Sequence, residues 1–94
     1  MIARVVLAGQ VTKGLKKLPQ HVVDKLLDWV SAVETLGLQE VRKVSGYHDE
    51  PLKGARKGQR SIRLSRSYRA FYRVEKDRVE LEYVLVIDVN KHQY

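Results

Sequence analysis

Apolar residues follow two different periods along the chain, and the change falls near residue 60. Residues 2–7 form a short stretch rich in β-branched side chains, which predicts a strand. Val11, Leu15 and Leu18 then recur at the spacing of one helix face, which predicts an amphipathic helix. The N-terminal half therefore begins with a strand followed by a helix.

A second, longer helix follows Pro19 and ends at Gly37. We expect Pro19 in its first turn, where a residue without an N–H loses no hydrogen bond, and Gly37 as its C-terminal cap. Its wide apolar stripe comprises Val22, Val23, Leu26, Leu27, Val30 and Val33. The two helices make a helical hairpin with one shared apolar side. Residues 38–45 predict a short helical turn, and residues 46–59 predict an extended functional loop.

From Arg60 onward the period is two, which predicts an antiparallel meander of three strands. The connections are a three-residue loop at 65–67 and a two-residue loop at 76–77. The inward-facing residues are Ile62 and Leu64, then Tyr68, Ala70, Tyr72 and Val74, then Val79, Leu81, Tyr83, Leu85, Ile87 and Val89.

The helical hairpin can bury its stripe only against this meander. We therefore predict one α+β domain over residues 1–94, in two layers, with the N-terminal strand and the helical hairpin packed on a small antiparallel sheet.

Composition narrows the chemistry. Eighteen Lys plus Arg against eleven Asp plus Glu give a net charge of +7, which makes an anionic partner the first hypothesis. No cysteine is present, which excludes a disulfide framework, a thiolate zinc site and a cysteine nucleophile. His21, His48 and His92 match no metal motif, so we expect no metal and no cofactor. No apolar run suits a membrane span or a signal peptide, and we expect a cytoplasmic protein.

The predicted register gathers basic residues on the sheet face away from the helices. Pairing Ile62 with Ala70 sets Arg63 opposite Arg69, and two arginines placed in this way favour a bound anion such as phosphate. Phe71 on the same face offers an apolar plate for a base, and Ser61 adds a donor. The plainer interpretation is a solvated face on which Arg73 pairs across the strands with Glu80.

Two further segments contribute titratable side chains. The loop at 49–54 carries Glu50 and Lys53 beside a proline and a glycine, and the last strand ends in His92 and Tyr94. Each is ordinarily a surface feature. Together with the arginines, they can converge as a phosphate binder, a base and an acid.

Four stretches in this order resemble the RelE/ParE superfamily, the toxins of bacterial type II toxin–antitoxin modules. They are Asp-Glu-Pro-Leu-Lys-Gly at 49–54, Gln-Arg-Ser-Ile-Arg-Leu at 59–64, Tyr-Arg-Ala-Phe-Tyr at 68–72 and Val-Asn-Lys-His-Gln-Tyr at 89–94. The resemblance covers nearly the whole chain, and it implies the same α+β architecture.

For the RNA-cleaving RelE, YoeB and HigB branch, the resemblance implies metal-free cleavage of mRNA, commonly on the ribosome, by attack of the 2′-hydroxyl on the adjacent phosphorus. Glu50, Arg69, His92 and Tyr94 then match catalytic positions. The candidate substrate-binding residues are Arg60, Ser61, Arg63, Phe71, Arg73 and Lys53. Ser61 stands where RelE has a lysine, and Gln93 separates His92 from Tyr94. Either Glu50 or His92 can be the general base.

The implied partners are a cognate antitoxin protein and mRNA on the ribosome, with 16S rRNA contacted by basic residues and operator DNA reached only through the antitoxin. No membrane is involved. Three alternatives stay open: a ParE-like inhibitor of DNA gyrase, a non-catalytic nucleic-acid-binding module, and a degenerate toxin that only binds its antitoxin. The combination of Glu50 with the His92 and Tyr94 ending argues against ParE, whose relatives generally lack it.

Overall fold

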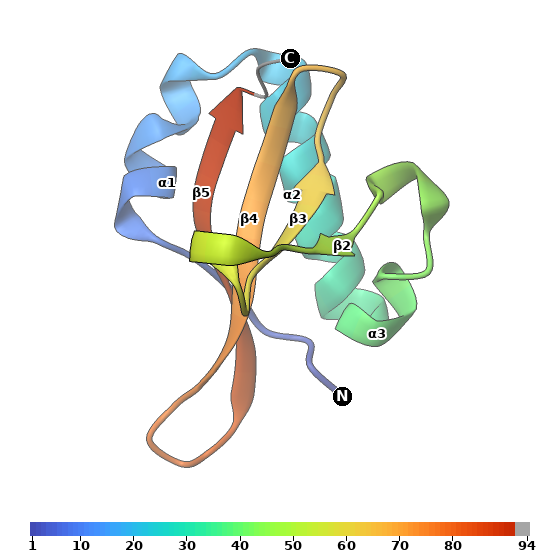
Figure 1. Ribbon diagram of the computed structural model, residues 1–94, viewed down its shortest axis with the longest axis vertical. Coiled ribbons are helices and arrows are strands. Elements are labelled where there is room, and N and C mark those ends of the chain that lie inside the picture. The colour runs from blue at the N-terminus through green and yellow to red at the C-terminus, as the bar shows by residue number, and fades with distance from the viewer. Residues whose placement is uncertain (92–94) are drawn as a thin grey trace.

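A computed structural model of the protein describes residues 1–91. Helices cover one side of a five-stranded sheet, and a long hairpin extends away from the body of the molecule (Figure 1). The elements, with 3₁₀ turns labelled η, are β1 (Val5–Leu7), α1 (Gly9–Gly14), η1 (Leu15–Lys17), α2 (Gln20–Leu36), α3 (Leu38–Val41), η2 (Ser45–Tyr47), β2 (Glu50–Pro51), η3 (Gly54–Arg56), β3 (Arg60–Arg63), β4 (Tyr68–Lys76) and β5 (Glu82–Lys91).

The two-layer α+β prediction is confirmed, but the sheet is mixed rather than antiparallel. Its strand order is β1-β5-β4-β3-β2, and β1 pairs in parallel with β5 while every other pair is antiparallel. Parallel pairing is possible here because the helices and three strands lie between β1 and β5 in the sequence and form the long connection that it needs. The first strand is also shorter than predicted, since only Val5–Leu7 pairs regularly. The loop at 46–59 contains an additional two-residue strand, β2, that the sequence pattern did not predict.

Both predicted helices form, and their apolar sides join one core. The first helix is a short α-helix that tightens into the 3₁₀ turn η1. Pro19 lies one position earlier than expected, as the residue that caps the N-terminus of α2. Gly37 ends α2 with φ 86°, a backbone angle that side chains disfavour, and α3 follows directly as the predicted helical turn. Among residues 1–91, no helix has the length and apolar character required to cross a bilayer.

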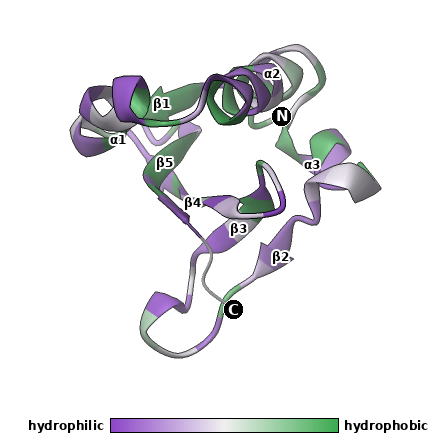
Figure 2. Ribbon diagram, turned by 90° about the horizontal axis from the view of Figure 1, so that it is seen from above, coloured by the Kyte–Doolittle hydropathy of each residue, from purple (hydrophilic) through white to green (hydrophobic). Residues whose placement is uncertain are grey.

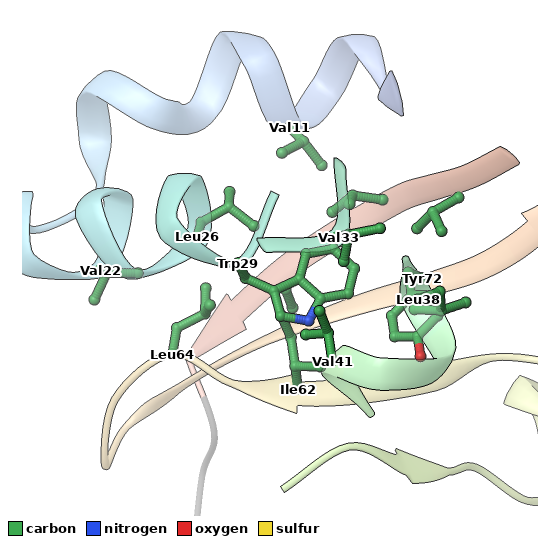
Figure 3. Packing of buried hydrophobic residues seen from close by; sticks show 13 residues of the cluster. Val11, Val22, Leu26, Trp29, Val33, Leu38, Val41, Ile62, Leu64 and Tyr72 are labelled. Atoms are coloured by element: carbon green, nitrogen blue, oxygen red, sulfur yellow. The ribbon is translucent and has the colours of Figure 1, made fainter. Parts of the chain in front are cut away.

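The core lies between α2 and the sheet, where the apolar faces of the two layers meet (Figure 2). The α2 residues that are fully buried are Val22, Leu26, Trp29 and Val33, whereas Leu27 is 46% exposed, so the buried stripe is narrower than predicted. Trp29 packs against Tyr72 of β4, with ring centroids 5.2 Å apart (Figure 3). The largest side chains of the two layers therefore meet at the centre of the domain.

The β4–β5 connection differs from the prediction. A five-residue loop at 77–81 replaces the two-residue turn, because the Asp77 carboxylate accepts hydrogen bonds from the Val79 and Leu81 amides and holds a wider loop. Val79 and Leu81 are consequently 71% and 62% exposed, not core residues of a strand. In β5 it is Val84 and Val86 that are fully buried, so the predicted inward positions Tyr83, Leu85 and Ile87 were wrong. The register shifts between Val86 and Asp88, and beyond this irregularity Val89 lies opposite Ala70 and packs against the core as predicted.

Candidate functional site

The face of the sheet opposite the helices carries polar side chains from β2, β3, β4 and β5. We call it the open face. Figure 2 shows α1 and α2 on one side of the sheet, and the segment that follows β2 on the other. The predicted register of β3 with β4 is confirmed, with Ile62 opposite Ala70 and Arg63 opposite Arg69.

Arg69 is the centre of the open face. Its Nη1 donates to Ser61 Oγ at 3.2 Å and to Glu50 Oε1 at 3.4 Å. These residues meet because β2 pairs Glu50 with Ser61, and Ser61 lies diagonally across from Arg69. The Arg69 side chain is 19% exposed and that of Glu50 is 57% exposed. A phosphate can therefore reach this guanidinium from the side where Glu50 stands.

Arg63 lies opposite Arg69 but extends toward another partner. Its Nη1 is 3.5 Å from Nε2 of His48, a residue held in the left-handed region at φ 47°. The two arginines are thus tolerated side by side because each guanidinium meets a different group. Their proximity still concentrates positive charge on this face.

A buried carboxylate fixes the strand that carries Glu50. Asp49 precedes Glu50, and its side chain is fully buried. Its Oδ1 accepts from Arg60 Nε at 2.6 Å and its Oδ2 accepts from the Tyr72 hydroxyl at 2.5 Å. Through these bonds the chain next to Glu50 is attached to both β3 and the core.

The pKa values in this network follow from the same contacts. Burial and the hydrogen bond to Asp49 raise the pKa of Tyr72 well above its ordinary range, against a smaller opposing influence of Arg42. Burial alone lowers the pKa of Arg60, but the hydrogen bond and charge of Asp49 outweigh it and raise that pKa. Arg60 and Tyr72 therefore stay protonated, and both can donate to Asp49 at neutral pH.

The structure does not bring all the predicted binding residues together. Arg60 faces the same side as Tyr72, its partner across the strands, and is occupied by Asp49. Lys53 is exposed in the loop after β2. Arg73 lies farther along β4 on the open face, where it pairs with Glu75 of its own strand, so the predicted Arg73–Glu80 pair is wrong. Glu50, Ser61, Arg63 and Arg69 remain as one group.

Phe71 does not present a bare ring. The guanidinium of Arg56 lies 4.0 Å above its centroid and also contacts Asp88 Oδ2 at 3.3 Å. Asp88 stands directly across from Phe71, and Asn90 directly across from Arg69. The aromatic plate is therefore covered by a cation from the loop.

His92 and Tyr94 lie outside the described residues. Within residues 1–91, no group of three or more histidine or acidic side chains could hold a metal ion.

Sequence reasoning missed His48, Asp49 and Arg56. One signal did point to Asp49: Tyr72 on the core face needs a buried hydrogen-bond partner, and the neighbouring loop supplies it. The position of Arg56 had no such signal, because it depends on how the loop folds back.

The arrangement can bind a phosphate and exchange a proton. A guanidinium can donate two parallel hydrogen bonds to a phosphate. The present contact of Arg69 with Glu50, at 3.4 Å, is longer than the 2.7–2.9 Å of a strong charged hydrogen bond. A phosphate oxygen can therefore displace Glu50 from Arg69 at small cost. The carboxylate then remains beside the bound phosphate, where a general base is useful.

Comparison with known proteins gives evidence from structure only. No family model matches the sequence, and no curated protein matches it. The YoeB/ParE toxin from Agrobacterium tumefaciens superimposes with a TM-score of 0.69 at 20% identity, covering 96% of this chain and 99% of that one. YafQ from E. coli gives a TM-score of 0.70 at 17% identity, covering 93% and 90%.

An archaeal RelE in complex with RelB, from Pyrococcus horikoshii, gives a TM-score of 0.67 at 20% identity, covering 97% of this chain and 96% of that one. All three matches extend over nearly the full length of both partners. The resemblance inferred from four short motifs is thus confirmed at the level of architecture, and the chain has the RelE/ParE toxin fold.

Proposed function

We propose that this protein is the toxin of a type II toxin–antitoxin system and that it cleaves mRNA. The observation that carries the proposal is the contact of Arg69 with both Ser61 and Glu50, beside Arg63, on the open face of a toxin-like fold. The positions of Glu50 and Arg69 are also those that the family resemblance assigns to chemistry.

The proposed reaction needs only protein side chains and the RNA. The 2′-hydroxyl attacks the adjacent phosphorus while its proton passes to a base, and the bond from phosphorus to the 5′-oxygen breaks. An acid returns a proton to that oxygen, leaving a 2′,3′-cyclic phosphate and a free 5′-hydroxyl. Arg69 and Arg63 stabilise the charge that builds on the phosphoryl oxygens. In this proposal Glu50 acts as the base, with His92 as its alternative, and Tyr94 is a further catalytic candidate.

The partners follow from the same proposal. Solved neighbours include the P. horikoshii RelE–RelB complex and a YoeB–YefM complex from Staphylococcus aureus, which supports a cognate antitoxin for this chain. The +7 charge supports binding to mRNA on the ribosome in the cytoplasm, with basic residues such as Lys13, Lys16 and Lys17 available for rRNA.

Brief induction in cells tests this function. We expect growth arrest and new mRNA fragments with 5′-hydroxyl ends. Arg69→Ala should abolish both while leaving the fold intact. Arg78→Ala, in the exposed loop at the far end of the hairpin, removes the same charge and should leave both unchanged.

Two results would contradict the proposal. One is growth arrest with intact mRNA and inhibited DNA supercoiling, as expected of a ParE-like gyrase inhibitor. The other is equal mRNA cleavage by wild type and folded Arg69→Ala.

A further inference from the structure

The loop between β2 and β3 sends one arginine across the open face. Arg56, in η3, places its guanidinium carbon 4.0 Å from the centroid of Phe71. Its Nη1 donates to Gln59 Oε1 at 2.8 Å and its Nη2 donates to Asp88 Oδ2 at 3.3 Å. A ring below and an acceptor on each terminal nitrogen hold this flat cation in one orientation.

The outer surface of Arg56 remains accessible. Its side chain is 37% exposed, although the ring covers one face and two hydrogen bonds occupy its edges. A guanidinium held in this way presents a flat surface, and such surfaces stack on planar rings. Fixing it in advance also removes part of the entropy cost of stacking.

Arg56 stands next to the proposed phosphate site. Phe71, which carries it, follows Arg69 by two residues on the same face, a separation of roughly 6.6–6.8 Å along a strand. Asn90 and Asp88, opposite Arg69 and Phe71 respectively, extend the same two rows. A nucleotide whose phosphate contacts Arg69 can therefore direct its base along this face toward Phe71 and the guanidinium stacked on it.

The charges favour a base over a second phosphate at this position. Asp88 already neutralises part of the Arg56 charge, and its carboxylate repels an incoming phosphate. A base brings no net charge, and exposed bases in single-stranded RNA commonly stack on aromatic rings and arginine planes.

We propose that Arg56, held on Phe71, is the stacking platform for the nucleobase that adjoins the phosphate bound by Arg69, and that Asp88 is a positioning residue for it. The platform takes one unpaired base of single-stranded RNA. This inference rests on the proposed function, because it needs a nucleic acid on the open face.

A binding experiment with uncleavable probes tests the platform. The probe is a 2′-deoxy trinucleotide whose single base is 2-aminopurine, and the reference is the same trinucleotide without any base. Neither can be cleaved through a 2′-hydroxyl, so the result does not depend on catalysis. We expect wild type to bind the base-bearing probe at least about 5-fold more tightly than the reference, since a stacked base is worth about 1–3 kcal/mol. Stacking should also quench the 2-aminopurine fluorescence.

Variants separate stacking from charge. Arg56→Lys keeps the charge but lacks the plane, so it should bring the affinity ratio close to one and abolish the quenching. Phe71→Leu should do the same by removing the support. Lys57→Gln, the neighbouring loop residue, loses a charge and should weaken both probes equally while keeping the ratio.

The outcomes also distinguish this inference from the proposed function. Quenching that depends on Arg56, in a protein that leaves cellular mRNA intact, would keep the platform and refute the nuclease. An unchanged affinity ratio in folded Arg56→Lys, or wild type that binds neither probe, would overturn the platform.

Discussion

Removal of the Asp49 carboxylate should destabilise the domain strongly. In Asp49→Ala, the buried Tyr72 hydroxyl loses its acceptor and the Arg60 guanidinium loses its ion-pair partner. An unsatisfied buried polar group costs about 1–3 kcal/mol, and breaking a buried ion pair costs about 3–5 kcal/mol. Because the Arg60 side chain is 25% exposed, water can replace part of its lost partner. We therefore expect a loss of about 3 kcal/mol.

Urea unfolding followed by tryptophan fluorescence measures this loss, since Trp29 packs against Tyr72 and is the single tryptophan of the chain. For a domain of this size, about 3 kcal/mol corresponds to a fall in Tm of at least about 10 °C. Tyr72→Phe keeps the ion pair and should cost only about 1 kcal/mol. Glu34→Ala, an exposed acidic position on α2, should change stability by less than about 0.5 kcal/mol.

A double-mutant cycle identifies the cause. If the bond between Tyr72 and Asp49 contributes as argued, the cost of Tyr72→Phe should vanish when Asp49 is already alanine. Full additivity of the two substitutions, or a loss below about 1 kcal/mol for Asp49→Ala, would refute the reasoning.

Three further predictions concern the fold. Gly37→Ala should cost about 1–3 kcal/mol of stability, because φ 86° with ψ 150° is a region that only glycine adopts readily. Gly14→Ala, at a helical position with free space around it, should be neutral or stabilising. Equal effects of the two substitutions in thermal unfolding would argue against this explanation of Gly37. Hydrogen bonds from the Leu81 and Val79 amides, together with Arg4, lower the pKa of Asp77, so its contribution to the hairpin is present above the unfolded-state pKa of about 3.9 and is lost as the pH falls through the lower folded-state pKa. Amide hydrogen exchange at Leu81 should therefore differ between wild type and Asp77→Asn at neutral pH and converge in acid, and a difference that persists in acid would contradict the assignment. In urea unfolding, Val79→Thr should leave stability within about 0.5 kcal/mol of wild type because Val79 is exposed, whereas Val84→Ala should cost about 2 kcal/mol because Val84 is fully buried. The reverse order would support the inward positions that the sequence predicted.

The sequence pattern predicted an element correctly wherever the spacing of apolar residues fitted only one structure. The long stripe of α2 predicted its length, and Gly37 predicted its end. The short loop after β3 predicted the register that places Arg63 opposite Arg69. The side chains of the open face followed from that register.

The pattern was insufficient where the apolar signal is continuous or the contact is distant. Residues 83–87 are all apolar, so alternation could not tell which of them face the core. The pairing of β5 with β4 skips Ile87, and this irregularity places Val86 opposite Tyr72 and Val84 opposite Val74, both inward. The hairpin loop is wider than predicted because the Asp77 carboxylate accepts hydrogen bonds from two backbone amides, and the spacing of apolar residues gives no sign of such bonds.

The candidate site shows the same division. Glu50, Ser61 and Arg69 were named from sequence and lie together in the structure. Arg60 was named with them, but its position depends on a buried carboxylate at Asp49, which no period reveals. Arg56 reaches Phe71 only because the loop after β2 folds back over the sheet.

The most direct test of the central claim is analysis of RNA ends produced by the purified protein on ribosomes programmed with a defined mRNA. We predict fragments that end in a 2′,3′-cyclic phosphate and begin with a 5′-hydroxyl, and no cleavage where the nucleotide before the scissile bond carries a 2′-deoxyribose. Folded Arg69→Ala should yield no fragments. Fragments with 5′-phosphate ends, or cleavage that persists at the 2′-deoxy position, would contradict cleavage by attack of the 2′-hydroxyl.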